Sequence, residues 1–399
     1  MPEIWKLFGR VDGATRGRRA TGRISILDRV FLHVGLEKTG TTTLQVTMAL
    51  NRRLLERYGY FFPTTLEGSP SNHIGLALCA ANPEAATDLR QYAGLTSGAA
   101  YAAFLQRYPR QIAEALTQSG CHSAILSNEH CSSRLFTIAE IAKLRDIITP
   151  LARECRAIIY LRRQDELVAS HYSNSVKAGA THEFYYPNGI QWLDYLRVLD
   201  MWAQVFGKEN LTIRIFEPEQ LRDGDLVADF FSTIGFAHYS QLVRPENQNR
   251  SLDIHTVEFL RRLNAHLPAC SDIAISRDRG SINEALASIT TRERLRPSAE
   301  AATTFLDQFA ASNAEVARRF LNRENGVLFT SIPLCNEPRL PSLDVDQAVA
   351  ISAALWQWQA ARLRAPKHAD TTGLRREARP MLDPKFYRNR RGRFSASEG

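Results

Sequence analysis

The sequence predicts an α/β protein in three layers, with a mainly parallel sheet flanked by helices and with C-terminal helical additions. Four short apolar segments are each followed by a longer segment with helical periodicity. Strands that alternate with helices in this way form parallel sheets that are covered on both faces. After Leu252 the strand patterns fade and helical patterns dominate, which predicts the C-terminal additions.

Each predicted strand is a short apolar run bounded by polar or turn residues. In chain order, the strands are residues 30–34, 123–126, 157–161 and 211–216. A helix after Thr41 carries Leu44, Met48, Leu55 and Tyr58 at roughly helical spacing, ends near Gly59, and precedes an irregular segment at 60–70. Further helices are predicted at 73–81, 101–117, from the third strand through Lys177, and at 223–234, 254–267, 299–322 and 345–363.

The 399-residue chain divides into four predicted parts. We expect a basic flexible leader at 1–28, an α/β core at 29–250, a helical extension that completes the domain at 251–370, and a basic mobile tail at 371–399. From Arg375 onward, the tail has eight Lys or Arg residues against three acids. Such a charged stretch is typical of mobile chain.

The composition is that of an ordinary globular protein, with 44% apolar and 23% charged residues. No apolar run reaches the roughly 18 residues that a membrane span needs. The N-terminus lacks the apolar segment of a secretory signal, and the six cysteines are scattered without a C-x-x-C pair. These features predict a cytoplasmic protein with no metal site, and the net charge of +8 favours an anionic partner.

The most informative segment runs from the first strand through a glycine-framed turn into a helix. It reads VFLHVGLEKTGTTTLQ over residues 30–45. Gly35 and Gly40 let the backbone turn tightly, so that successive N–H groups point inward. The positive end of the following helix adds partial charge. The segment is therefore predicted to be a phosphate-binding loop, which makes the fold similar to that of P-loop NTPases.

The lysine of this loop is in an unusual position. A loop that uses ATP or GTP reads G-x-x-x-x-G-K-[ST], but here Thr41 follows the second glycine and the lysine is Lys38, inside the turn. A glycine frame with a displaced lysine and a Thr-Gly-Thr-Thr run resembles the sulfotransferases that use 3′-phosphoadenylyl sulfate (PAPS). The resemblance implies that the loop binds the donor's 5′-phosphate and that Lys38 contacts the sulfuryl group in transfer. The implied donor-binding residues of the loop are Lys38, Thr39, Gly40, Thr41, Thr42 and Thr43.

A second candidate half-site follows the third strand. Arg162 stands at the strand end, and Ser170 lies eight residues later, in the next helix. Arginine offers paired donors to phosphate oxygens, and serine offers a hydroxyl. In the sulfotransferase family an Arg and a Ser at this separation bind the 3′-phosphate of the donor. Arg163 is the competitor of Arg162 for this role.

The resemblance covers residues 29–251. It includes the pattern of Tyr195, Leu199, Trp202 and Gly207, which is similar to bacterial family members, and the Asp-Phe-Phe run at 229–231. Many cytosolic members close over the 3′-phosphate with an Arg-Lys-Gly loop that this chain lacks. We expect Arg250, in the polar run 247–251, to take its place.

Four residues are candidates for the general base or for contact with the acceptor. Glu129 and His130 follow the second strand, where ligands bind in open α/β sheets, and family members place a catalytic His or Glu close to this point. Glu129 is the first choice and His130 the second. His73 and Glu37 are expected near the acceptor, with Glu37 also a candidate partner of Lys38.

The sequence thus predicts a PAPS-dependent sulfotransferase that acts on a hydroxyl or amine of a carbohydrate-like or lipid-linked acceptor. No metal is expected, because sulfuryl carries less charge than phosphoryl in transfer, and no specific nucleic acid partner is predicted. Two alternatives remain open. One is a P-loop kinase that transfers phosphate from ATP, and the other is a non-enzymatic protein whose basic ends bind polyanions. The sequence leaves the oligomeric state open.

Overall fold

A computed structural model describes residues 26–64, 71–84, 86–245, 252–267, 273–290, 293–332 and 338–364. The predicted tail at 371–399 and nearly all of the predicted leader lie outside these ranges. Arg250 lies outside them as well, so its predicted role is a matter for experiment.

The described chain forms the predicted α/β fold, around a five-stranded sheet in which every pair of neighbouring strands is parallel. The strand order is β2-β3-β1-β4-β5. The strands are β1 (Leu27–His33), β2 (Tyr60–Phe61), β3 (Ser123–Ser127), β4 (Ala152–Leu161) and β5 (Leu211–Ile215). Because β1 pairs in parallel with both β3 and β4, the carboxyl ends of these three strands lie at one edge of the sheet, where such sheets bind ligands.

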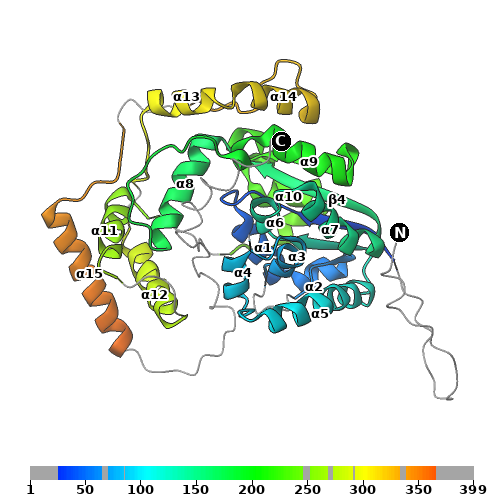
Figure 1. Cartoon of the computed structure of the whole chain (residues 1–399), viewed down its shortest axis with the longest axis horizontal. Coiled ribbons are helices and arrows are strands. Elements are labelled where there is room, and N and C mark those ends of the chain that lie inside the picture. The colour runs from blue at the N-terminus through cyan, green and yellow to red at the C-terminus, as the bar shows by residue number, and fades with distance from the viewer. Residues whose placement is uncertain are drawn as a thin grey trace, which may run out of the picture.

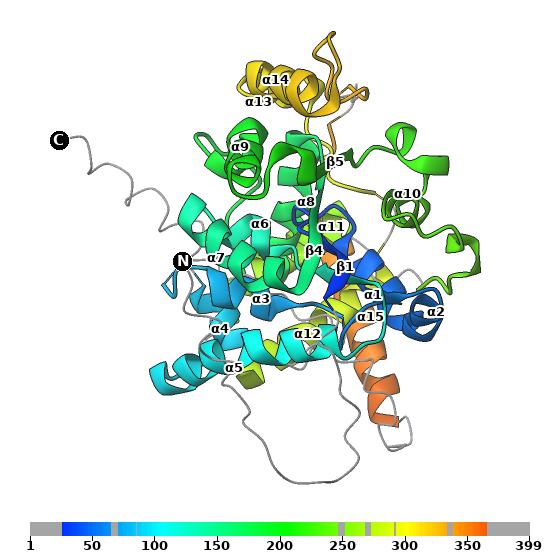
Figure 2. The same cartoon turned by 90° about the vertical axis from the view of Figure 1, so that its right-hand side faces the viewer.

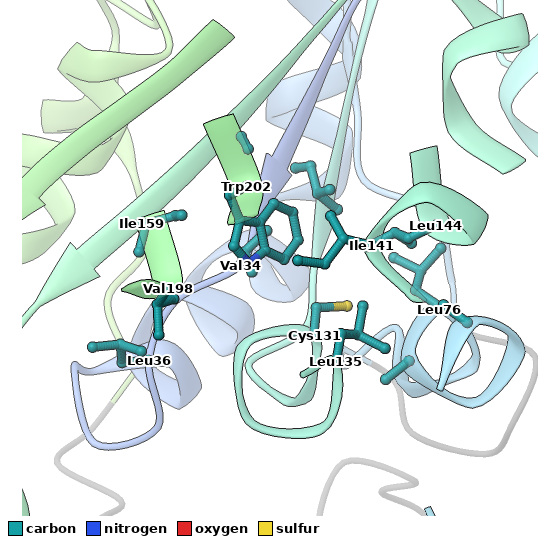
Figure 3. Close-up of a cluster of buried hydrophobic side chains, with 14 of the residues drawn as sticks. Val34, Leu36, Leu76, Cys131, Leu135, Ile141, Leu144, Ile159, Val198 and Trp202 are labelled. Atoms are coloured by element: carbon teal, nitrogen blue, oxygen red, sulfur yellow. The ribbon is translucent and has the colours of Figure 1, made fainter. Parts of the chain in front are cut away.

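Both faces of the sheet are buried, since alternate side chains of each strand enter different cores. From β1, Val30 and Leu32 enter one core and Phe31 the other. The larger core lies under helices that include α3 (Ile74–Ala80), α5 (Gly98–Thr117), α7 (Ile138–Ile148) and α9 (Tyr195–Phe206). Figure 3 shows the Trp202 indole of this core lying between Val34 and Ile141. The second core lies under α1 (Thr41–Leu50), α2 (Arg52–Arg57) and α10 (Leu226–Thr233).

The C-terminal part is helical, as predicted. It comprises α11 (Ile254–Asn264), α12 (Ile273–Ile289), α13 (Ala299–Asp307), α14 (Ala310–Leu321) and α15 (Val345–Arg364). Figure 1 shows α11, α12 and α15 gathered beside α8 (Gln164–Lys177), while α13 and α14 lie at another side of the molecule. Tyr172 and Val176 of α8 share a small core with Leu260 and Leu286. Figure 2 shows the same arrangement from the side, with α9 between the sheet and α14.

The element boundaries differ from the prediction where long-range contacts intervene. The helix after the loop breaks at Asn51, whose side-chain nitrogen donates to the carbonyls of Thr47 and Val243 and whose oxygen accepts from the Val243 amide. The segment predicted to be irregular after Gly59 begins with the short edge strand β2, and β4 begins five residues earlier than predicted. The predicted helix 299–322 is two helices. The helices α4 (Thr87–Tyr92), α6 (His130–Arg134), α7 and α12 were not predicted.

Cys79, Cys121, Cys131 and Cys155 are free thiols, and the other two cysteines are outside the described ranges. Within those ranges, every helix is too short or too polar to cross a membrane.

Two fully buried histidines make stability depend on pH. Burial lowers the pKa of His33 to about 3 and that of His73 to about 4, from an ordinary value of 6.5. Below pH 6.5 the unfolded chain therefore binds protons that the folded chain excludes. We predict that each of the two lowers the free energy of unfolding by about 1.4 kcal/mol per pH unit as the pH falls from 6 toward 4. Urea unfolding at pH 7, 6 and 5 measures this slope, and a constant free energy across the series would contradict it.

Candidate functional site

The turn between β1 and α1 has a left-handed backbone at two positions. Lys38 has a φ angle of 69° and Gly40 one of 78°. A Cβ atom at position 40 would be strained at this angle and would also collide with the Leu226 side chain. Lys38 adopts the same region with a full side chain, and backbone strain of this kind concentrates at functional sites.

The first glycine of the frame is needed for a different reason. A Cβ atom at Gly35 would lie 2.8 Å from His33 Nε2 and 2.8 Å from Thr41 Cγ2. Both side chains belong to the elements that flank the turn, and both are buried. Gly35 therefore lets the end of β1 approach the start of α1 closely.

The loop presents a series of free backbone donors. The N–H groups of residues 35–43 donate to no acceptor in the described part of the chain. The Thr39 hydroxyl donates to the carbonyl of Leu36 over 2.6 Å, and Leu36 is buried in the core beside Val198 (Figure 3). The turn is thus anchored to the core, and its unbonded amides lie in the segment that leads into α1, which is an arrangement suited to an anion.

Lys38 lies half-buried in this turn. Among the described residues, its ammonium makes no hydrogen bond and no ion pair. Burial lowers the pKa of Lys38 below its ordinary value; the charge of Arg162 lowers it as well, whereas Glu37 and Glu129 act in the opposite direction. A half-buried cation without a directly paired anion favours an anionic ligand.

Arg162 reaches the loop from the end of β4. Its Nη1 donates to the Lys38 carbonyl over 3.0 Å, and its guanidinium lies 5.6 Å from the centre of the Phe216 ring. Its Nε donates to Glu166 over 3.1 Å. The hydrogen bond to Lys38 joins the two half-sites that the sequence predicted separately.

The competing arginine is engaged elsewhere. Arg163 is buried, donates to both carboxylate oxygens of Asp165 over 2.7 and 2.9 Å, and donates to Ser331 Oγ over 2.9 Å. Ser170 lies on α8 one turn beyond Glu166, and its hydroxyl makes no hydrogen bond to another described group. These contacts favour Arg162 over Arg163 as a phosphate ligand.

Glu37 is the centre of a buried group of charges. One of its oxygens lies 3.4 Å from His130 Nδ1 and 3.4 Å from Arg134 Nη1, and the other lies 3.7 Å from His171 Nε2. Arg134 is fully buried and also pairs with Asp88 on α4 over 2.7 Å. Burial opposes the ionisation of Glu37, but the hydrogen bond from His130 and the nearby positive charges outweigh it, so that the pKa of Glu37 lies well below its usual range.

Glu129 lies at the other end of this group, two residues after the end of β3. Its Oε1 is 3.9 Å from His130 Nε2. Its Oε2 accepts from Gln45 Nε2 over 2.8 Å, and both oxygens accept from Asn72 Nδ2 over 3.2 to 3.3 Å. The carboxylate is thus oriented by side chains from α1 and from the segment before α3.

His73 has a different environment from the other candidates. Its Nε2 lies 3.2 Å from the Pro63 carbonyl, and its Nδ1 accepts from the Ser127 amide over 3.0 Å. The side chain is fully buried. Contacts of both ring nitrogens with the main chain favour a structural role for His73.

The structure therefore brings Glu37, Lys38, Glu129, His130 and Arg162 to one edge of the sheet. Four side chains that complete this group were not predicted from the sequence, namely Gln45, Asn72, Arg134 and His171. Lys177 was not predicted either. Its pKa is lowered to about 8 by burial and by the charge of Lys38. Gln45 directly follows the loop and Asn72 directly precedes His73, so their positions gave a local signal. Arg134, His171 and Lys177 gave none.

The loop residues Thr42 and Thr43 are exposed at the start of α1, whereas Thr39 and Thr41 are buried. Within the described ranges, no group of three or more His, Cys, Asp or Glu side chains is placed to hold a metal ion.

Comparison with known proteins gives few matches, and no protein-family model matches the chain. An uncharacterized protein of Archaeoglobus fulgidus is 27% identical over 200 residues, which are 47% of this chain and 51% of that protein. The chain thus matches about half the length of that relative. A solved sulfotransferase from Alicyclobacillus acidocaldarius aligns with 73% of this chain and 95% of its own at 14% identity and a TM-score of 0.36.

We predict that Glu37→Gln destabilises the protein, because it removes the charge of a carboxylate that faces the buried Arg134 guanidinium. The expected loss in the free energy of unfolding is about 3 kcal/mol. Urea unfolding at pH 7 measures it.

The matched control is Glu315→Gln on α14. Glu315 pairs with Arg318 over 3.0 Å, but both side chains are nearly half exposed. The expected loss is below about 1 kcal/mol. Equal losses in the free energy of unfolding would show that the buried pair stabilises the fold no more than the exposed pair does.

Proposed function

We propose that the protein is a sulfotransferase that moves a sulfuryl group from 3′-phosphoadenylyl sulfate to a hydroxyl or amine. The observation that carries this proposal is the hydrogen bond from Arg162 to the Lys38 carbonyl. It places a second cation beside a loop of free amides whose lysine lies inside the turn. The loop alone is sufficient to bind a single phosphate at the start of a helix. A donor that carries both a 3′- and a 5′-phosphate on its ribose requires a second cationic group.

The donor fits the residues that are present. Free amides at 35–43 and the exposed hydroxyls of Thr42 and Thr43 suit its 5′-phosphate and sulfate. Arg162 and Ser170 suit the 3′-phosphate, because one offers charged donors and the other a hydroxyl with no described partner. The bound donor supplies an activated sulfuryl group.

Lys38 is proposed to stabilise charge during transfer. Negative charge accumulates on the bridging oxygen as the bond from sulfur to phosphate breaks, and a positioned cation that is poorly solvated stabilises it strongly. The left-handed turn and the Arg162 hydrogen bond fix the backbone from which the Lys38 side chain projects. A kinase loop would instead place its lysine after the second glycine.

The proton of the acceptor is proposed to pass to the buried group of acids and imidazoles around Glu37. Sequence reasoning favours Glu129, then His130, as the base, and both belong to this group. The acceptor stays a prediction: a hydroxyl or amine on a carbohydrate-like or lipid-linked molecule. The cytoplasmic location also stays a prediction.

Transfer of labelled sulfate from PAPS to a panel of acceptors tests the proposal, in parallel with transfer of labelled phosphate from ATP. We expect sulfate transfer that continues in the presence of a metal chelator. Magnesium-dependent phosphate transfer from ATP without sulfate transfer would instead support the kinase alternative.

We predict that Lys38→Ala lowers the turnover number by at least about 100-fold, because the charge of the lysine acts mainly in the transition state. The affinity for adenosine 3′,5′-bisphosphate should change by less than about fivefold. Single-turnover assays and calorimetric titration measure the two quantities. Lys143→Ala, at an exposed position of α7, is the control and should change neither. Normal turnover in Lys38→Ala would show that the loop binds phosphate but that Lys38 has no role in the transfer step.

We predict that Arg162→Ala weakens binding of adenosine 3′,5′-bisphosphate by about tenfold to 100-fold, since a charged hydrogen bond to the 3′-phosphate is lost. Binding of 5′-AMP, which has no 3′-phosphate, should change much less. Calorimetric titration of both nucleotides measures the difference. If both affinities fell equally, Arg162 would act only by holding the loop.

A further inference from the structure

The helix α15 has two apolar faces. Figure 1 shows it at the edge of the molecule, with α11 and α12 on its inner side. Its inner face packs Ile351 and Leu355 against the core that contains Leu260 of α11 and Leu286 of α12. A helix at the surface of a globular protein usually has one apolar face, which is turned inward, and polar residues on the side toward solvent. The second apolar face of α15 is therefore available for contact with another molecule.

The outward face of α15 carries four large apolar side chains that are strongly exposed. The exposed fractions are 77% for Val345, 63% for Val349, 78% for Trp356 and 77% for Leu363. Val349, Trp356 and Leu363 recur every seven residues, and Val345 precedes Val349 by one helical turn. All four therefore lie on the same side of the helix.

Small side chains fill the positions between them on this side, namely Ser352, Ala353 and Ala360. The Ser352 hydroxyl donates to the Ala348 carbonyl over 2.8 Å, so it needs no partner outside the helix. These seven side chains form the outer stripe of α15. Single exposed apolar residues are common, but a contiguous apolar patch marks an interaction surface. A seven-residue repeat of large apolar side chains is typical of helices that pair along their length.

The order of large and small side chains makes the outer stripe complementary to itself when two copies lie antiparallel. One register places Val349 opposite Ala360 of the partner subunit and Trp356 opposite Ala353 of the partner subunit. Each large side chain near the centre then meets a small one, and at the two ends an aliphatic side chain meets another. Alternation of large and small residues across a contact lets two helices pack closely. The sequence of the stripe thus favours a second copy of this chain as its partner.

The charges beside the outer stripe favour the same arrangement. Asp346 and Arg364 are exposed and stand about five helical turns apart, so both flank the same side of the stripe. The antiparallel register brings Asp346 beside Arg364 of the partner subunit, and the twofold symmetry repeats this pair at the other end. A parallel pair would instead bring two aspartates together at one end and two arginines at the other. Charge complementarity therefore selects the antiparallel orientation.

We propose that the protein forms an antiparallel dimer through α15, in which the outer stripe packs against the same stripe of a second copy. A twofold contact of this kind uses one patch on both subunits. The helix is only about 30 Å long, and one helix face buries less than the roughly 1,200 Å² of a typical stable interface. We therefore expect a dissociation constant of about 1 to 50 µM. The residues of the candidate site lie outside α15, so the pairing does not depend on the proposed function.

Sedimentation velocity of the full chain at about 1 to 200 µM tests the pairing, and we expect a reversible shift from monomer to dimer. Trp356→Glu should raise the dissociation constant by at least about 30-fold, because it buries a charge at the centre of the contact. Ala361→Glu is the matched control, since it adds the same charge at an exposed position of α15 outside the stripe. It should change the constant by less than about threefold. A monomer at every concentration, or a dimer that Trp356→Glu does not weaken, would overturn the proposal.

Exchange of the flanking charges tests the orientation. Asp346→Arg places two arginines together at both ends of the dimer, and Arg364→Asp places two aspartates there. Each variant alone should dimerise at least about fivefold more weakly than the wild type. An equimolar mixture of the two should associate about as tightly as the wild type, because every arginine then faces an aspartate. Variants that each dimerise normally, in a mixture that associates more tightly than the wild type, would show a parallel pair and refute the proposed arrangement.

A lipid surface is the competing partner for an apolar helix face that carries a tryptophan. Flotation with vesicles of phosphatidylcholine and phosphatidylglycerol separates the two partners. We expect the wild type and Trp356→Glu to stay equally unbound. Vesicle binding by the wild type that Trp356→Glu abolishes, without a dimer in solution, would show that the outer stripe binds lipid and would overturn the proposal. Thermal unfolding of each variant confirms that it is folded, as the exposure of Trp356 leads us to expect.

Discussion

The hydrogen bond from the Arg162 guanidinium to the Lys38 carbonyl is the contact on which the candidate site depends. It crosses from the end of β4 to the turn after β1, and it holds Lys38 in a left-handed conformation that side chains rarely adopt. The amides of residues 35–43 have no partner in the described chain, and the Lys38 ammonium has no direct counter-ion there. The parallel sheet positions both partners, because its carboxyl ends meet at one edge.

Buried charge around Glu37 connects several elements at this edge. The Glu37 carboxylate links the loop to α6 through His130 and Arg134, and to α8 through His171. Arg134 extends this network to α4 by pairing with Asp88. Each of these charges is costly to bury alone, so the group is stable only as a whole. Any displacement of α8 relative to the loop would therefore disturb the ionisation of several groups together.

Local patterns in the sequence predicted the sheet, the loop and the two strand-end candidates Glu129 and Arg162, because a strand, its following turn and a helix start are encoded within a few residues. The break at Asn51 was not predictable in this way, since the Asn51 side chain bonds to Val243, far along the chain. His171 was missed for a similar reason. Nothing adjacent to it in the sequence reveals that α8 lies against the loop, and only the packing of that helix brings its ring to Glu37.

A crystal structure of the protein with adenosine 3′,5′-bisphosphate is the most direct measurement of the site. We expect density for the 5′-phosphate against the amides of the turn after Gly35, with the 3′-phosphate within hydrogen-bond distance of Arg162. We also expect the Lys38 ammonium to face the 5′-phosphate. A nucleotide bound elsewhere, or one whose 3′-phosphate extends into solvent away from Arg162, would show that the loop and Arg162 do not form one donor site.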